Sequence, residues 1–171
     1  NGYWRDIGTI RSFYDTNLAF TNSDSPFSFH CSKFPIYTAV LPLPSSIVAN
    51  SELNDVTLAE GCKISGAKIE HSVIGVRSQI SSGTTIKDSI IMGADCSSMG
   101  GTQSTVTMSI GVDCVIEGAI LDKNVRLGEG VTIRPFPRGV EMDCGNWFVR
   151  DGIVVISKDA EIAAGTVIAP E

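Results

Sequence analysis

The sequence is poor in aromatic residues and in histidine. Only 7% of the residues are aromatic although 43% are hydrophobic, so small aliphatic side chains must supply most of the core. That balance suits a narrow interior better than a globular core built on large rings. The two histidines, His30 and His71, are too few for a three-histidine zinc site within one chain. We interpret His71 as a structural residue, and a general-base role remains the open alternative.

Long apolar runs, basic clusters and paired cysteine motifs are also missing. No stretch approaches the roughly 18–20 apolar residues of a membrane span, so we expect no membrane partner. A net charge of −6 without a basic cluster argues against nucleic acid as a partner. Five cysteines without a CxxC spacing favour reduced thiols in an intracellular protein and leave a regulatory disulfide open. The first residue is Asn1 and not Met, so we expect a piece of a longer protein.

An aliphatic residue that returns about every six positions is the main feature that is present. Neither a helix nor a simple strand alternation has this period, whereas the hexapeptide repeat of a β-solenoid does. The sequence therefore predicts a mainly β protein, a parallel β-helix whose aliphatic side chains point inward and stack from coil to coil. We expect the left-handed form, as in known hexapeptide proteins. The repeated residues are Leu58, Ile64, Ile69, Ile74, Ile80, Ile86, Ile91, Ile110, Ile116, Leu121, Leu127, Ile133, Ile156, Ile162 and Ile168.

Three regions follow one another along the chain. Residues 1–20 predict a short helix that starts at Gly8 or Thr9. Residues 21–45 are polar and rich in proline, which predicts an irregular linker. Residues 46–171 hold the repeat, with two interruptions that we expect to leave the coil, because each is too long for a corner: 93–109 and 134–152. The apolar stripe expected on the helix comprises Ile7, Ile10, Phe13, Tyr14 and Leu18.

Motifs along most of the chain resemble one enzyme family. GYWRDIGTIRSFYDTNL (2–18) and PIYTAVLPLPSS (35–46) are similar to the segment that joins the two domains of ADP-glucose pyrophosphorylases. This family, the glucose-1-phosphate adenylyltransferases, makes ADP-glucose and pyrophosphate from ATP and glucose 1-phosphate for glycogen or starch synthesis. The resemblance implies a C-terminal domain without its nucleotidyltransferase half, inactive alone. Further motifs in the family's order are HSVIGVRSQI (71–80), IKDSIIMGAD (86–95), AILDKNVRLGEGVTI (119–133) and GIVVISKDAEIAAGTVI (152–168).

The resemblance also implies a metal residue. Asp6 in YWRDIGT matches the aspartate that helps to hold the catalytic Mg²⁺, and Trp4 would help to shape the same region. The cation would bridge phosphate oxygens during adenylyl transfer. On its own Asp6 would be an exposed or helix-capping carboxylate. We therefore expect it to hold Mg²⁺ only together with the absent catalytic domain.

Two lysines match family residues that bind anionic activators such as 3-phosphoglycerate or fructose 1,6-bisphosphate. They are Lys123 in LDKN and Lys158 in SKDA, and lysine supplies the mobile point charge that a phosphorylated ligand needs. We expect Arg134 to join them as an effector residue. Arg138 and Arg150 are further candidates, and Arg77 is a candidate phosphate contact that more simply lies on the surface.

One position departs from the family pattern. Leu41 stands in IYTAVLPLP where an arginine implicated in the inhibitor response would align, which puts inhibition through that residue in doubt. The expected partners are the chain's own catalytic domain, other subunits of a homo- or hetero-tetramer, and phosphorylated metabolites. The bacterial cytoplasm is preferred over the plastid stroma as the location. A purely structural solenoid without an effector site is the alternative function, and an acyltransferase-like solenoid is a weaker one.

Overall fold

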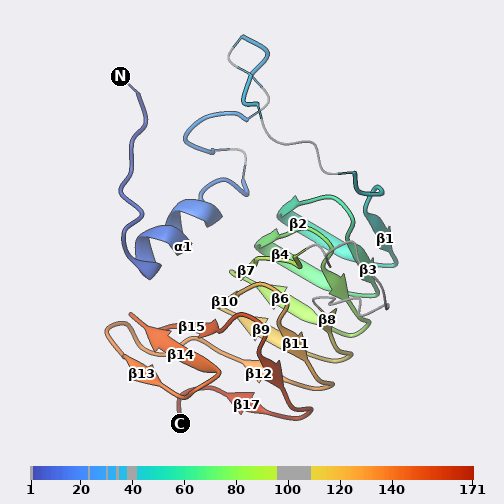
Figure 1. Cartoon of the computed structure of the whole chain (residues 1–171), viewed down its shortest axis with the longest axis vertical. Coiled ribbons are helices and arrows are strands. Elements are labelled where there is room, and N and C mark those ends of the chain that lie inside the picture. Colours follow the sequence, from blue (N-terminus) through green and yellow to red (C-terminus); the bar gives the residue numbers. More distant parts are fainter. Residues whose placement is uncertain (1, 23, 30, 34, 38–41, 96–108) are drawn as a thin grey trace.

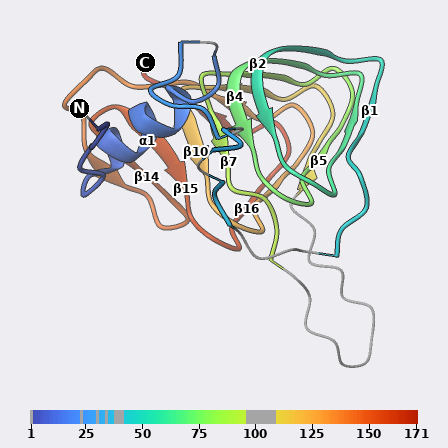
Figure 2. The same ribbon diagram turned by 90° about the horizontal axis from the view of Figure 1, so that it is seen from above.

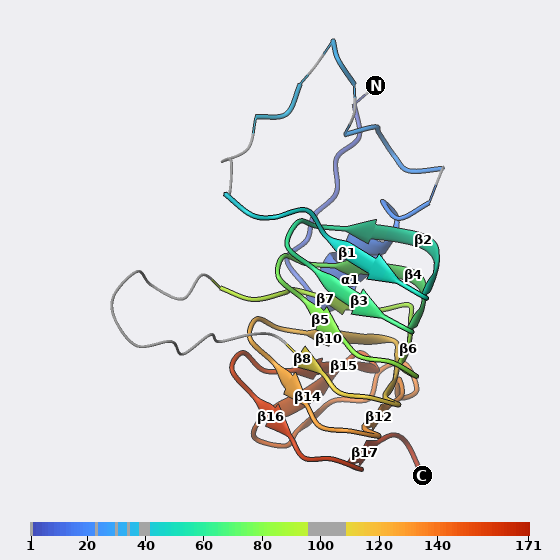
Figure 3. The same cartoon turned by 90° about the vertical axis from the view of Figure 1, so that its right-hand side faces the viewer.

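The computed structural model describes residues 2–22, 24–29, 31–33, 35–37, 42–95 and 109–171, which form a stack of β coils with one helix packed against its side (Figures 1 and 3). The helix, α1 (Ile10–Leu18), begins after Thr9 because the side chains of Thr9 and Ser12 cap each other's backbone N–H groups. Ile7 lies before this cap and is exposed, so its expected place on the helix was wrong. The described residues between 21 and 45 contain no helix or strand.

The strands of the coils form three faces. One face is a parallel six-stranded sheet, which contains, in spatial order, β1 (Ile47–Ala49), β3 (Lys63–Ser65), β5 (Gln79–Ile80), β8 (Ser109–Ile110), β11 (Arg126–Leu127) and β16 (Glu161–Ile162). The second consists of the first halves of β2 (Glu52–Leu58) and β4 (Lys68–Ile74), then β6 (Thr85–Lys87), β9 (Val115–Glu117), β12 (Thr132–Ile133) and β17 (Val167–Ile168).

The third face starts from the second halves of β2 and β4, which turn a corner at Asp55 and His71, both with positive φ. It continues with β7 (Ile90–Ile91), β10 (Ala119–Leu121), β15 (Ile153–Ile156), β14 (Trp147–Arg150) and β13 (Met142–Asp143). β14 runs antiparallel to β15, and β13 runs antiparallel to β14. The segment 134–152 thus leaves the coil, as expected, and returns as a hairpin that extends this face.

The predicted aliphatic residues stack in three ladders, one for each face. Ile116 on the second face pairs in register with Ile86 before it and Ile133 after it, and all three are fully buried. The same register joins the repeat residues of the other faces. The six-residue period is therefore confirmed as the spacing that returns a side chain to the core at each face.

The helix covers the outside of the third face. Seen along the stack in Figure 2, α1 lies outside the coils, beside β15, β10 and β7. Its buried Tyr14 and Leu18 belong to a second apolar cluster, formed with the outward side chains of Ile90, Ile120, Ile153 and Val155. Among the described residues, no helix has the length and apolar character to cross a membrane.

Candidate functional site

Lys123 and Lys158 lie one above the other in the stack of turns that follows the third face, which we call the lysine corner. Each is the second residue after its strand, β10 or β15, and these strands pair in parallel register. The backbone N–H of Asp159 donates to the carbonyl of Lys123 at 2.9 Å, which holds the two turns together. The chain turns at Asn124 and Asp159 with φ of 63° and 61°, a conformation that Asn and Asp adopt more readily than most residues.

The two lysines converge on one carboxylate. The Nζ atom of Lys123 lies 2.8 Å from Oδ1 of Asp95, and the Nζ atom of Lys158 lies 2.7 Å from Oδ2. Hydrogen bonds from the two ammonium groups lower the pKa of Asp95 to about 2, and the hydrogen bond to Asp95 raises the pKa of Lys158. Two residues 35 positions apart thus form one cationic pair, because the segment 134–152 lies between successive coils.

Asn124 forms hydrogen bonds to two aspartates of the lysine corner. Its Oδ1 accepts the backbone N–H of Asp95 at 2.8 Å, and its Nδ2 donates to Oδ1 of Asp159 at 2.8 Å. The asparagine is only 5% exposed, so a buried amide fixes the position of the Asp95 backbone. We did not predict roles for Asn124 or Asp95, although both lie inside motifs that carried the family resemblance, LDKN and IIMGAD.

The arginines of the second interruption lie elsewhere. Arg134 follows β12 at the corner between the second and third faces, where its Nη1 is 3.3 Å from Oε2 of Glu117. Arg138 pairs with Asp151, and Arg150 donates to Asp143 at 2.7 Å. The structure thus does not bring Arg134, Arg138 or Arg150 to the lysine corner, because the interruption leaves the coil one corner before Lys158. The effector role of Arg134 stays a prediction.

Arg77 is the arginine that does reach the lysine corner. It lies in the equivalent turn after β4, and its Nη1 donates to the carbonyl of Ala94 at 3.3 Å. Ala94 precedes Asp95 in the chain, so this guanidinium contacts the backbone one residue before the carboxylate that the two lysines share. The phosphate contact that we considered for Arg77 stays a prediction.

His71 lies at the corner between the second and third faces. Its Nδ1 is 2.6 Å from Oδ1 of Asp88 in the next turn of the same stack, so the ring links two coils. This contact agrees with a structural role. His30, Leu41 and Cys96 lie outside the described residues. The described cysteines, Cys31, Cys62, Cys114 and Cys144, are free thiols.

Asp6 makes a local turn and belongs to no metal site in the described part of the chain. Its Oδ1 accepts the backbone N–H of Gly8 at 2.9 Å, and the neighbouring Trp4 is largely exposed. Mg²⁺ requires about six oxygen ligands in near-octahedral geometry. Among the described residues, no three His, Cys, Asp or Glu side chains are grouped closely enough to hold a metal ion. A single carboxylate does not meet that requirement, so ligands from outside the described residues would have to complete the site.

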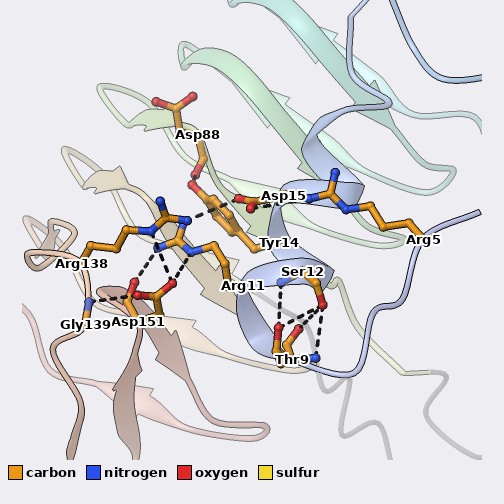
Figure 4. Close-up of polar contacts among 10 residues, drawn as sticks. All are labelled: Arg5, Thr9, Arg11, Ser12, Tyr14, Asp15, Asp88, Arg138, Gly139 and Asp151. Carbon is orange, nitrogen blue, oxygen red and sulfur yellow. Dashed lines mark hydrogen bonds and ion pairs between the residues drawn. The ribbon is translucent and has the colours of Figure 1, made fainter.

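Polar contacts join α1 to the third face (Figure 4). Nε of Arg11 lies 2.9 Å from Oδ2 of Asp151, and the Tyr14 hydroxyl donates to the backbone carbonyl of Asp88. The hydrogen bond from Arg11 is the main cause that lowers the pKa of Asp151. Desolvation by burial, followed by the nearby Asp88 charge, raises the pKa of Tyr14. Apolar burial and charged contacts thus fix the helix on the coils.

A cavity of ≈ 420 Å³ lies between α1 and the coils. Asp15, Asp88 and Glu117 line it together with Arg11 and His71. Arg11 and His71 contact two different carboxylates, those of Asp151 and Asp88. Lys123 and Lys158 instead converge on a single carboxylate, which makes the lysine corner the better candidate for an anion site.

The fold and the lysine corner define a hexapeptide-repeat β-helix domain with a converging pair of cationic side chains. The chain belongs to the family described as GLGC left-handed parallel beta-helix domain, whose model matches residues 42–167. The predicted left-handed β-helix and the resemblance to ADP-glucose pyrophosphorylases are thereby confirmed.

A curated relative extends the likeness to the N-terminal segment. The small subunit of a chloroplastic/amyloplastic glucose-1-phosphate adenylyltransferase from Triticum aestivum is 40% identical over 177 residues. The match covers 98% of this chain and 37% of the relative. The chain thus spans little more than a third of the length of that protein.

Proposed function

We propose that this chain is the regulatory and assembly domain of a glucose-1-phosphate adenylyltransferase in starch or glycogen synthesis, and that phosphorylated effectors bind at its lysine corner. The observation that carries the proposal is the convergence of Lys123 and Lys158 within 2.8 Å of one carboxylate. Two ammonium groups that already share one anionic partner are spaced to share the terminal oxygens of a phosphate.

The packing of α1 supports a regulatory role. The strands under this helix, β7, β10 and β15, lead within four residues to Asp95, Lys123 and Lys158. A change at the corner would reach α1 through these strands, and α1 is the segment we expect to adjoin the catalytic domain. Regulation further requires that the effector bind two states of the enzyme with different affinity. In the whole enzyme Asp6 would contribute to Mg²⁺ binding, and we expect the isolated chain to be inactive.

The first coil supports an assembly role. Val48 and Leu53 occupy ladder positions, yet they are 41% and 38% exposed, whereas the residue that pairs with Val48 in the next coil, Ile64, is fully buried. A solenoid needs a cover at its ends to keep such side chains from water. Another subunit or the chain's own catalytic domain would supply it. The same observation favours the second candidate function, a purely structural oligomerisation domain.

The proposed cellular location rests on the similarity to the Triticum aestivum relative. The chloroplastic/amyloplastic relative from Triticum aestivum supports the plastid, which was the alternative to the cytoplasm that we preferred from the sequence. We propose the plastid stroma if the source of this chain is a plant, and the bacterial cytoplasm otherwise.

Calorimetric titration of the 171-residue chain with 3-phosphoglycerate and with fructose 1,6-bisphosphate tests the effector site. We expect Lys158→Ala to raise the Kd of the bound effector at least about fivefold, because one of two ammonium contacts is lost. Lys63→Ala is the matched control, since Lys63 is an exposed lysine on β3, on another face. Equal effects of the two substitutions, or no binding by the unsubstituted chain, would rule out the lysine corner and leave the structural candidate.

A further inference from the structure

We propose that Asp95 is an internal competitor for the effector, so that a ligand binds at the lysine corner by displacing the Asp95 side chain. This inference rests on the proposed effector site and adds how the site selects its ligand. Both lysine Nζ atoms are already within hydrogen-bond distance of the Asp95 carboxylate, one at each oxygen. An incoming anion therefore has to take over contacts that are occupied.

Asp95 is the one aspartate of the described corner that contacts the ammonium groups. Oδ1 of Asp122 accepts the backbone N–H of Lys123 at 2.7 Å, and Oδ1 of Asp159 accepts the amide of Asn124 at 2.8 Å. Uncharged donors thus hold these two carboxylates. Two charged donors hold Asp95, and Nδ2 of Asn124 adds one long hydrogen bond to its Oδ2 at 3.5 Å. Displacement of Asp95 alone is enough to free both lysines.

The displacement needs a side-chain rotation and no backbone rearrangement. The Asp95 backbone N–H stays bound to Asn124, and the N–H of Ala94 donates to the carbonyl of Val76 at 2.9 Å. The Asp95 side chain is 37% exposed, so a different rotamer can place its carboxylate in water. Exposed lysine–carboxylate pairs are weak because solvent screens the two charges, so an anion of higher charge can replace them.

The competitor selects for the charge of the ligand. A simple carboxylate offers the lysines the same group as Asp95 but lacks the advantage of being tethered beside them. A phosphate monoester carries up to about two negative charges and three acceptor oxygens near neutral pH. It can replace both lysine contacts and leave an oxygen for a further donor such as Arg77. The corner should therefore bind phosphate esters and reject carboxylates of similar size.

Titration of the chain with 3-phosphoglycerate and with glycerate, which lacks the phosphate, tests this selection. We expect Asp95→Asn to bind 3-phosphoglycerate about three- to tenfold more tightly, the range expected when two exposed ion pairs no longer compete. The same variant should gain measurable affinity for glycerate, which the unsubstituted chain should not bind. Asp95→Ser removes the same carboxylate and should change both affinities in the same direction.

Asp122→Asn is the matched control. It changes the charge of the same corner by the same amount but removes no contact with an ammonium group. Equal tightening in Asp122→Asn and Asp95→Asn would overturn the competitor role in favour of a general charge effect. The competitor role would also be overturned if Lys123→Ala abolishes binding but Asp95→Asn binds 3-phosphoglycerate no more tightly than the unsubstituted chain. If Lys123→Ala binds as well as the unsubstituted chain, the effector site itself is wrong.

Discussion

The stacked ladder predicts that an isoleucine in the middle of the coils contributes more to stability than the ladder residue of the first coil. Ile116→Ala removes three carbons from a fully buried position between Ile86 and Ile133. At about 0.8 kcal/mol for each buried carbon, the transfer term is about 2.4 kcal/mol. A cavity remains because β9 is held by neighbours on both sides, which brings the expected loss of unfolding free energy to about 3–4 kcal/mol.

Leu53→Ala is the matched comparison, because Leu53 occupies the same ladder in the first coil. It has a ladder neighbour on one side, Ile69, and 38% of the residue is already exposed. About 60% of the transfer term is then lost and no closed cavity forms, so we expect a cost of about 1.5 kcal/mol.

Urea unfolding followed by far-ultraviolet circular dichroism, at low protein concentration, measures both losses. The linear extrapolation gives the unfolding free energy of each variant relative to the unsubstituted chain. Equal costs of Ile116→Ala and Leu53→Ala would refute the reasoning, since the first coil would then be as well covered in solution as the middle of the stack. A cost of Ile116→Ala below about 1 kcal/mol would contradict the inward stacking itself.

Two further predictions concern ionisable groups. Because the folded-state pKa of Asp95 is depressed to about 2, its contribution to stability is present above the unfolded pKa and is lost as the pH falls from about 4 toward 2. The difference in melting temperature between the unsubstituted chain and Asp95→Asn should therefore shrink over this range, and a constant difference would contradict the ion pairs. The raised pKa of Tyr14 predicts that the folded chain loses stability above about pH 10, where tyrosine ionises in the unfolded state. Tyr14→Phe should reduce that alkaline loss and cost about 1 kcal/mol at neutral pH through the hydrogen bond to Asp88, and an unchanged alkaline melting curve would contradict the burial of the hydroxyl.

The sequence also contains a pattern that indicates the docking of α1, and this pattern is separate from the six-residue period. Ile90, Ile120 and Val155 each precede a ladder residue, so they point outward, at a position where the other two faces carry mainly polar side chains. Adjacent aliphatic residues on successive coils indicate a face that is covered on both sides. The helical spacing of Tyr14 and Leu18 indicates a matching stripe. Both patterns were present, but only the tertiary structure shows that they meet.

The candidate site was predictable in part. The resemblance singled out Lys123 and Lys158, and the structure brings them together. It did not single out Asp95, because an aspartate two residues after Gly93 resembles the aspartates of the other corners when only the sequence is considered. Arg134 lies nearer to Lys123 in the sequence than Lys158 does, yet it is placed on another corner. In a solenoid the coil register, and not the distance along the chain, decides which side chains are neighbours.

The amino-acid sequence sets the local structure of this protein. An aliphatic residue every sixth position, with turn-forming residues between, leaves a parallel β-helix as the arrangement that buries each of these residues, and Thr9 with Ser12 sets the start of the helix. The contacts between coils are visible only in the tertiary structure. They are the ion pairs of Lys123 and Lys158 with Asp95, the separation of Arg134 from this group, and the packing of α1 on the third face. The reason for this difference is physical: the six-residue period reflects the burial of one aliphatic side chain at each face of a coil, which is a property of a short stretch of sequence. The site depends on the number of residues in each interruption, which sets the corner at which the chain returns.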